Sequence, residues 1–254
     1  MKDKLVVVKI GGNIIENDSL MDKFLMSFVK IKDKKILIHG GGKIVSNFLK
    51  KINVEPKLIN GRRVTDNKTL DVVAMVYAGL INKKIITKLQ KYNCNSLGLS
   101  GPDCNTILAK KRKVKKIDYG FAGDIEKINK KFLKQILDLN ICPVICSLTH
   151  DQNGQLLNTN ADTIASKISI ELSKKFNVIL NYCFDKSGIL INNQKQDIVS
   201  AKVYKKLIKK NIIVDGMIPK IENCFSALKN GVNEVYIGNH QIINNKKNCT
   251  KLTL

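Results

Sequence analysis

The chain has 254 residues, of which 44% are hydrophobic, and it carries a formal net charge of +23. This length is enough to bury a substantial core, and the absence of a long apolar run excludes a membrane-spanning helix. The chain start lacks a signal-peptide core and the seven cysteines lack a C-x-x-C pair, so we expect a cytoplasmic protein with reduced thiols and no zinc site. The basic residues are spread along the chain without interleaved aromatic residues, which argues against a nucleic-acid partner and favours anionic small-molecule substrates.

The first predicted element is a buried strand over residues 4–10, which leads directly into Gly11 and Gly12. Its β-branched run is typical of an interior strand. Two successive glycines let an anion such as phosphate approach backbone N–H groups, and Lys9 would face that anion. A surface lysine before an ordinary Gly-Gly turn is the alternative interpretation of this segment taken alone.

The same pattern returns at a second predicted strand, over residues 35–38. This strand runs into His39 and the glycines Gly40 to Gly42, after which the apolar spacing predicts a helix over 43–52. A helix that begins after a glycine turn presents N–H groups to an anion. The segment matches neither the Walker A nor the dinucleotide-binding pattern. Two glycine turns at the carboxyl ends of neighbouring strands predict a crevice for two anionic substrates.

Helical and strand patterns continue to alternate along the chain. Before residue 150 we expect helices over 19–31, 67–91 and 130–139, strands over 96–101 and 141–146, and hairpins over 57–65 and 106–128. This alternation predicts an α/β protein with an open, mainly parallel central sheet sandwiched between helix layers, with projecting β-hairpins.

The rest of the chain extends this pattern into a second lobe. Here we expect helices over 161–175, 200–210 and 218–230, strands over 177–182 and 234–237, and a loop over 185–188. No linker rich in Pro, Gly or Ser separates the halves. We therefore expect one continuous sheet shared by a lobe over residues 1–175 and a lobe over residues 176–254.

Two helix starts carry residues that suit a binding site. Asn158, Asn160 and Asp162 surround the start of the helix at 161, where Asn160 is also a good N-cap and Asp162 is favoured by the helix dipole, so capping is the simpler explanation for them. Lys220 lies in the first turn of another helix, after Pro219. A cation is unfavourable there unless an anion is bound, although a solvated lysine is the alternative.

Several segments occur in an order and spacing that resemble the acylglutamate kinases of the amino acid kinase family. The segments that carry the resemblance are Lys9 to Gly12, His39 to Gly42, Gly61 to Thr65, Asn158 to Asp162 and Gly216 to Lys220, together with Gly98 to Asp103, Asp118 to Ile125 and Ser187 to Leu190. Each segment alone is modest evidence, but the ordered set is specific and covers nearly the whole chain.

The resemblance implies the amino acid kinase fold and the ATP-dependent phosphorylation of the γ-carboxylate of N-acetyl-L-glutamate, a step of arginine biosynthesis. It implies that Lys9 and Lys220 contact the transferring phosphoryl group and that Asp162 orients the two lysines. The residues implied to hold the amino acid substrate are Gly41, Gly42, Arg63 and Asn158. Those implied for the nucleotide are Gly11 and Gly12, which would donate N–H groups to phosphate oxygens, and Asp185, Lys186, Ser187, Gly188, Ile189, Leu190, Ile212, Ile213 and Val214.

The chemistry of this assignment is consistent with the residues present. A carboxylate is ionised at neutral pH, so the attacking oxygen needs no general base. It needs positive groups around the moving phosphoryl oxygens, which two lysines and two glycine turns supply. Because no acidic cluster stands out in the sequence, we expect no metal ligands in the chain and Mg2+ carried mainly by the ATP phosphates and water.

The resemblance also implies lobe functions and assembly. Residues 1–175 would bind the amino acid and dimerise, and residues 176–254 would bind the nucleotide. Arginine-inhibited hexameric relatives carry an extra helix before the first strand, so we expect a homodimer without arginine feedback; tight inhibition of the protein by arginine would refute this.

Three alternatives remain open at this point. In the first, the acceptor is N-succinylglutamate, N-acetylaminoadipate or the substrate of another amino acid kinase, in place of N-acetylglutamate. In the second, the chain is a non-catalytic nucleotide-binding regulator, although the presence of Lys9, Asp162 and Lys220 argues against this. The third alternative is a nucleic-acid-binding protein, which the net charge alone would favour.

Overall fold

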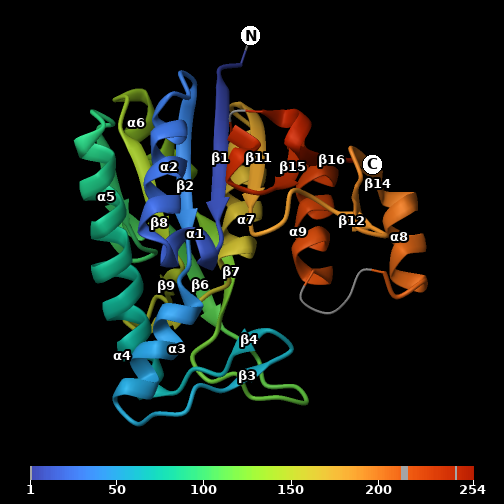
Figure 1. Cartoon of the computed structure of the whole chain (residues 1–254). Coiled ribbons are helices and arrows are strands. Elements are labelled where there is room, and N and C mark those ends of the chain that lie inside the picture. The colour runs from blue at the N-terminus through green and yellow to red at the C-terminus, as the bar shows by residue number, and fades with distance from the viewer. Residues whose placement is uncertain (1, 213–216, 244) are drawn as a thin grey trace. The chain divides into compact units, whose positions relative to one another are not determined.

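The computed structural model describes residues 2–212, 217–243 and 245–254 and divides the chain into two compact units. Unit 1 comprises Met1–Ile36 and Ala165–Leu254, and unit 2 comprises Leu37–Ile164. The chain passes from one unit to the other within strand β2 (Lys34–His39) and helix α7 (Ala161–Ser173) (Figure 1). Unit 1 is thus built from both ends of the sequence.

Unit 1 contains a five-stranded run of sheet in the order β14-β16-β15-β11-β1. The strands are β1 (Lys4–Ile10), β11 (Asn177–Cys183), β14 (Ile198–Ser200), β15 (Glu234–Gly238) and β16 (Cys249–Thr253). β1 and β15 both pair with β11 in parallel, β14 pairs with β16 in parallel, and β15 and β16 are antiparallel. Leu5 to Ile10 are all buried, as is typical of a parallel strand covered on both faces.

The other elements of unit 1 are helices, a short hairpin and two 3-10 turns. They are α1 (Gly12–Glu16), α2 (Asp18–Val29), α8 (Ala201–Lys209), α9 (Ile218–Lys229), hairpin strands β12 (Leu190–Ile191) and β13 (Gln194–Lys195), η3 (His240–Ile243) and η4 (Lys246–Asn248). Helix α2 illustrates how the sequence sets these elements. The Asn17 side chain caps it by accepting a hydrogen bond from Leu20 N, and Met21, Phe24 and Phe28 bury one face.

Unit 2 contains the parallel strands β2, β8 (Cys142–Cys146) and β5 (Ser96–Leu99). Its helices are α3 (Gly42–Lys51), α4 (Asn67–Ala74), α5 (Asn82–Lys91) and α6 (Lys130–Asp138). A π-helical stretch, Met75–Ile81, joins α4 to α5, so residues 67–91 form one continuous helical run along the edge of unit 2 (Figure 1). A second sheet has the order β10-β9-β6-β7.

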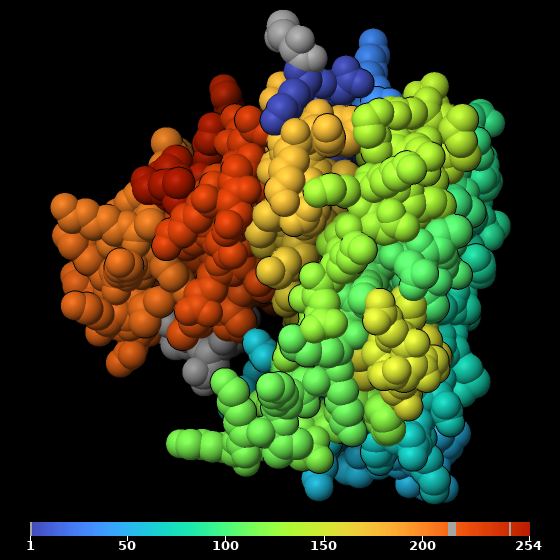
Figure 2. All heavy atoms as spheres, turned by 180° about the vertical axis from the view of Figure 1, so that it is seen from behind, coloured from blue at the N-terminus to red at the C-terminus, as the bar shows by residue number. Residues whose placement is uncertain are grey.

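Hairpins and short turns complete unit 2. They are β6 (Ile107–Lys111), β7 (Gly123–Ile128), β9 (Leu148–His150), β10 (Leu156–Asn158), the hairpin strands β3 (Leu58–Ile59) and β4 (Arg62–Arg63), and the 3-10 turn η2 (Asp103–Asn105). The connection between β6 and β7, green in Figure 2, protrudes from unit 2 as an arm.

The predicted fold class is confirmed, with parallel strands flanked by helices and with projecting hairpins in unit 2. Two details of the prediction were wrong. β16, which follows the strand predicted over 234–237, was not predicted, and neither was β14. The predicted lobes, 1–175 and 176–254, stay a prediction about function; the compact units differ from them in that the first 36 residues join the C-terminal part.

The cysteines and the membrane prediction can also be compared with the structure. All seven cysteines are in the thiol form; six are buried and Cys104 is exposed. Across residues 2–212, 217–243 and 245–254, no helix is both long enough and apolar enough to span a membrane.

Candidate active site

The glycine loop of unit 2 connects β2 to α3. Gly41 has φ +148°, and a Cβ built on it would lie 2.1 Å from Ile81 Cδ1 and 3.3 Å from Tyr77 Cε1. The π-helical stretch therefore packs directly against the loop, and only glycine fits at this position. Gly42 begins α3, so the N–H groups of the first helical turn are presented here together with the positive end of the helix dipole.

His39 anchors the same loop from inside the unit. Its side chain is fully buried. Nδ1 lies 3.0 Å from Gly40 O, and Nε2 lies 3.0 Å from Asn82 Nδ2. Since a carbonyl only accepts and an amide nitrogen only donates, Nδ1 carries the proton and Nε2 accepts. Burial lowers the pKa of His39 to about 4, so the ring is neutral at physiological pH. The Asn82 amide also donates to Val144 O at 3.0 Å and so fixes the ring to β8.

Arg63, in β4, is bound to the start of α3 through one of its two amino groups. Nη2 donates to Gly42 O at 2.6 Å and to Ser46 Oγ at 2.7 Å. The other group, Nη1, is buried and makes no hydrogen bond to any residue in the described part of the chain. A buried guanidinium nitrogen without a partner is costly, and a planar anion such as a carboxylate is the ligand that would satisfy it.

Tyr77 lies beside this guanidinium. A Cβ on Gly42 would lie 3.9 Å from both Arg63 Nη2 and Tyr77 Oη, so all three groups border one space. Burial lowers the pKa of Arg63, and the Tyr77 hydroxyl opposes that shift. Burial likewise raises the pKa of Tyr77, which keeps its hydroxyl neutral. The fixed positive charge here is therefore that of Arg63.

Asn158 joins the same set of hydrogen bonds from the end of β10. Its Nδ2 donates to Thr65 Oγ1 at 3.0 Å, and Thr65 Oγ1 donates to Arg63 O at 3.3 Å. The backbone N of Asn158 donates to Phe121 O at 2.8 Å, so the residue is also fixed at its main chain. Unit 2 thus brings together the four residues predicted to hold the amino acid substrate, Gly41, Gly42, Arg63 and Asn158.

Asp162 lies in the first turn of α7. The capping explanation holds for its neighbour, because Asn160 Oδ1 accepts from Asp162 N at 2.8 Å and from Thr163 N at 3.2 Å. The Asp162 side chain is 6% exposed. A Cβ on Gly40 would lie 3.6 Å from Ala161 Cβ, so the start of α7 packs against the glycine loop.

In unit 1, Lys9 and the first glycine turn lie against the end of β11. Lys9 is 9% exposed and pairs in register with Tyr182. A Cβ on Gly11 would lie 3.2 Å from Cys183 O and 3.5 Å from Phe184 Cα. Burial raises the pKa of the Cys183 thiol, and the nearby Lys9 ammonium opposes that shift. The Gly11 turn therefore borders the start of the predicted nucleotide segment, 185–190.

That segment is exposed at its start and becomes buried further along. Asp185 and Lys186 are exposed, whereas Gly188 and Ile189 are buried. Ile212 is 38% exposed, and Ile213 and Val214 lie outside the described residues, as do Asp215 and Gly216. Lys220 is half-buried in the first turn of α9, which has a proline at its start.

The predicted site residues are thus distributed over both units. Unit 1 carries Lys9, Gly11, Gly12, Lys220 and the segment 185–190, and unit 2 carries the four substrate residues and Asp162. That they act in a single site stays a prediction. Within the described part of the chain, no group of three or more His, Cys, Asp or Glu side chains is arranged to hold a metal ion.

Comparison with known proteins identifies the family. The model of the amino acid kinase family matches residues 4–239. The chain belongs to the amino acid kinase family. Two family members named acetylglutamate kinase, from Phocaeicola vulgatus and Cytophaga hutchinsonii, are each 45% identical to it, over 93% and 92% of this chain and 94% and 90% of their own lengths. The crystal structure of the smu.665 protein of Streptococcus mutans is also similar, with a TM-score of 0.82 and 27% identity over 92% of this chain and 94% of that one.

Sequence reasoning missed several polar side chains that organise this amino acid kinase site. Tyr77 and Asn82 lie in an apolar helical pattern, where an aromatic residue or an amide gives no signal of its own. Ser46 and Thr65 lie within a few residues of predicted site residues, but their contacts with Arg63 depend on the fold. His39 belongs to the predicted glycine motif His39 to Gly42, but the sequence pattern assigned no role to its side chain.

Proposed function

We propose that the protein is an acetylglutamate kinase, which transfers the γ-phosphoryl group of ATP to the γ-carboxylate of N-acetyl-L-glutamate. The product would be N-acetylglutamyl 5-phosphate, an intermediate of arginine biosynthesis. Relatives of that name match nearly the full chain at 45% identity. The structural observation that carries the proposal is the buried Arg63 Nη1 beside the first turn of α3, which has no hydrogen-bond partner among the described residues.

On the acceptor side, Arg63 would bind the carboxylate of the amino acid that does not react. The guanidinium is already fixed by Gly42 O and Ser46 Oγ, so little side-chain freedom is lost on binding. The N–H groups of Gly41 and Gly42 and the amide of Asn158 would bind further acceptor oxygens. Holding the acceptor rigidly matters because phosphoryl transfer depends mainly on alignment of the attacking oxygen.

In the transfer step, the acceptor carboxylate attacks the γ-phosphoryl group of ATP without a general base, because the carboxylate is already ionised. Lys9 and Lys220 would neutralise the charge on the phosphoryl oxygens in the transition state, and Asp162 would orient their ammonium groups. Gly11 and Gly12 would donate N–H groups to phosphate oxygens. Residues Asp185 to Leu190 and Ile212 to Val214 would line the nucleotide site. Bound Mg2+, carried mainly by the phosphates and water, would supply additional charge neutralisation.

The proposal extends to assembly and location. We propose a cytoplasmic homodimer whose substrates are anionic small molecules rather than nucleic acid. Met75 and Leu80, exposed by 63% and 49% on the helical run of unit 2, are apolar side chains that a second copy would cover.

Two related acceptors remain alternatives. N-succinylglutamate and N-acetylaminoadipate share the free α-carboxylate that Arg63 would bind, and they differ from N-acetylglutamate only in the acyl group or in chain length. The Arg63 contacts therefore favour this class of acceptor without selecting among its members.

The experiment that tests the proposal is trapping of the acyl phosphate with hydroxylamine. The protein is supplied with ATP, Mg2+ and one acceptor from a panel of N-acetyl-L-glutamate, N-succinyl-L-glutamate, N-acetyl-L-aminoadipate, aspartate and glutamate. We expect hydroxamate with the highest kcat/KM for N-acetyl-L-glutamate, and a loss of at least about a hundredfold in kcat in Lys9→Ala and in Lys220→Ala. A higher kcat/KM for another acceptor would show that this acceptor, not N-acetyl-L-glutamate, is the substrate. Undiminished turnover in the lysine variants would refute the proposed mechanism. No hydroxamate with any acceptor would refute the assignment as a kinase of this class.

A further inference from the structure

The nucleotide segment 185–190 continues directly into the hairpin formed by β12 and β13. In this hairpin Leu190 pairs with Lys195 and Ile191 pairs with Gln194. The next opposite pair in this register is Ile189 with Gln196, which forms the base of the hairpin. One of the two hydrogen bonds expected for such a pair is present, from Gln196 N to Ile189 O at 2.9 Å.

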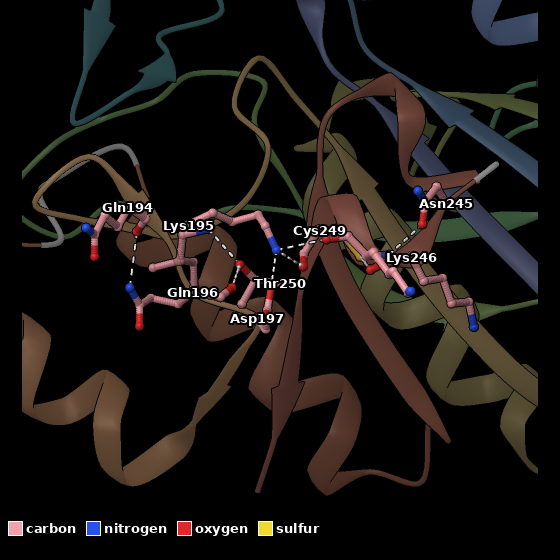
Figure 3. Close-up of polar contacts among 10 residues, drawn as sticks. Gln194, Lys195, Gln196, Asp197, Asn245, Lys246, Cys249 and Thr250 are labelled. Atoms are coloured by element: carbon pink, nitrogen blue, oxygen red, sulfur yellow. Dashed lines mark hydrogen bonds and ion pairs between the residues drawn. The ribbon is translucent and has the colours of Figure 1, made fainter.

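The second bond of this pair runs through a side chain of the C-terminal strand. Ile189 N donates to Thr250 Oγ1 at 2.9 Å. Thr250 Oγ1 in turn donates to Gln196 O at 2.6 Å (Figure 3). The hydroxyl therefore replaces a direct N–H to carbonyl bond. Thr250 is completely buried, so water does not compete for these two contacts.

Thr250 also lies against the glycine of the nucleotide segment. A Cβ built on Gly188 would lie 2.4 Å from Thr250 Oγ1 and 3.1 Å from Thr250 N. The backbone of Gly188 thus runs directly over the start of β16, at a distance that excludes any other residue at position 188. The same threonine contacts two successive residues of the segment, at Gly188 by packing and at Ile189 by a hydrogen bond.

A lysine of the hairpin makes a second attachment to the same strand. Lys195 Nζ donates to Lys247 O at 2.9 Å and to Cys249 O at 3.4 Å, and it pairs with Asp197 (Figure 3). The main chain adds a bond from Lys251 N to Asp197 O at 2.8 Å. The hairpin and the start of β16 are therefore held together on both sides of Thr250.

We propose that Thr250 is a positioning residue for the nucleoside triphosphate. Through its hydroxyl it fixes the end of the segment Asp185 to Leu190, so that the loop is ordered before the nucleotide binds. This inference rests on the proposed function, because it takes this segment to contact ATP. An ordered loop costs less conformational entropy on binding, and its loss weakens affinity for the nucleotide rather than for the acceptor.

The test compares Thr250→Val with Thr250→Ser. Valine keeps the shape and removes the hydroxyl, and serine keeps the hydroxyl. For Thr250→Val we expect the dissociation constant of MgATP, measured by calorimetry without acceptor, and the KM for MgATP to rise about tenfold, because valine removes both hydrogen bonds of the buried hydroxyl. The KM for the acceptor should change by less than about twofold. Thr250→Ser should remain within about threefold of the wild type for MgATP.

The matched control is Thr253→Val, the same chemical change in the same strand beyond the hairpin base. This variant should leave the dissociation constant and the KM for MgATP within about twofold of the wild type. If Thr250→Val does not fold, Thr250→Cys replaces it, because a thiol packs at this size but hydrogen-bonds weakly. That variant should also bind MgATP several-fold more weakly.

The outcomes separate this inference from the proposed function. Wild-type affinity for MgATP in Thr250→Val or Thr250→Cys would overturn the role of Thr250 and leave the kinase assignment intact. Weaker binding in these variants, combined with no acyl phosphate from the wild type, would support the role of Thr250 and overturn the kinase. A wild-type protein that does not bind MgATP would overturn both.

Discussion

At the level of single residues, the candidate site depends on Arg63. Arg63 is 8% exposed, and of its two amino groups Nη2 hydrogen-bonds within the protein whereas Nη1 has no hydrogen-bond partner among the described residues. The neighbouring Arg62 is exposed on the same short strand. Two adjacent arginines of identical chemistry therefore differ in burial and in the support that the fold gives them, and only Arg63 is arranged to bind an anion in a defined orientation.

This difference gives the first prediction. Arg63→Lys should raise the KM for N-acetyl-L-glutamate about 10-fold to 100-fold, because an ammonium group cannot bond Gly42 O and Ser46 Oγ while also binding a carboxylate in two-point fashion. The KM for MgATP should stay within about twofold. Steady-state kinetics of Arg63→Lys and of the control Arg62→Lys check this. Equal acceptor KM values for both variants and the wild type would contradict the role of Arg63.

At the level of elements, the glycine loop is held in place by a polar contact between β2 and α5. His39 at the end of β2 and Asn82 at the start of α5 hydrogen-bond in the core, and a Cβ on Gly98 of β5 would lie 2.0 Å from Asn82 Oδ1. With the bond from the same amide to Val144 O of β8, four elements meet at this side chain. Because His39 is buried and neutral, this contact makes the free energy of unfolding depend on pH.

The second prediction concerns that dependence. The pKa of His39 is about 4 in the folded protein, against 6.5 for an unperturbed histidine. Between these two pH values the unfolded state binds more protons, so the free energy of unfolding falls as the pH is lowered. From pH 7 to pH 4 the wild type should lose about 3 kcal/mol more than His39→Gln, which has no ring to titrate. Urea unfolding of both proteins at pH 7, 5.5 and 4 measures this. Parallel pH profiles would refute the prediction.

The elements also show what the sequence predicted and what it could not predict. Strands β1, β2 and β11 each contain an uninterrupted run of three or more apolar residues, and they were found at the predicted positions. β16 was missed because Cys249 and Leu252 are the apolar residues of this short strand and do not alternate with polar ones, and because its register depends on β15 and β14. The π-helical form of Met75–Ile81 has no local signature, because the contacts of Tyr77 and Ile81 with Gly41 come from tertiary packing.

At the level of the whole molecule, unit 1 is discontinuous in sequence, whereas unit 2 is the continuous segment Leu37–Ile164. β1 pairs with β11 from the far end of the chain, so the first 36 residues belong with the C-terminal part. Local patterns carry no information on such long-range pairing. The order of elements alone therefore led to predicted lobes that divide the chain after residue 175. The site shows the same limit: the motifs predicted Gly42, Arg63 and Asn158, whereas their contacts through Ser46 and Thr65 required the structure.

The central claim is that a carboxylate oxygen of the acceptor attacks the γ-phosphorus of ATP, and isotope transfer tests it most directly. N-acetyl-L-glutamate carrying 18O in both oxygens of its side-chain carboxylate is converted with ATP and Mg2+ in the presence of hydroxylamine. Hydroxylamine attacks the acyl carbon and releases phosphate together with the bridging oxygen. We predict phosphate that contains one 18O atom, visible as an upfield shift in the 31P spectrum. Phosphate without 18O would show that water, not the carboxylate, accepts the phosphoryl group, and would contradict the account.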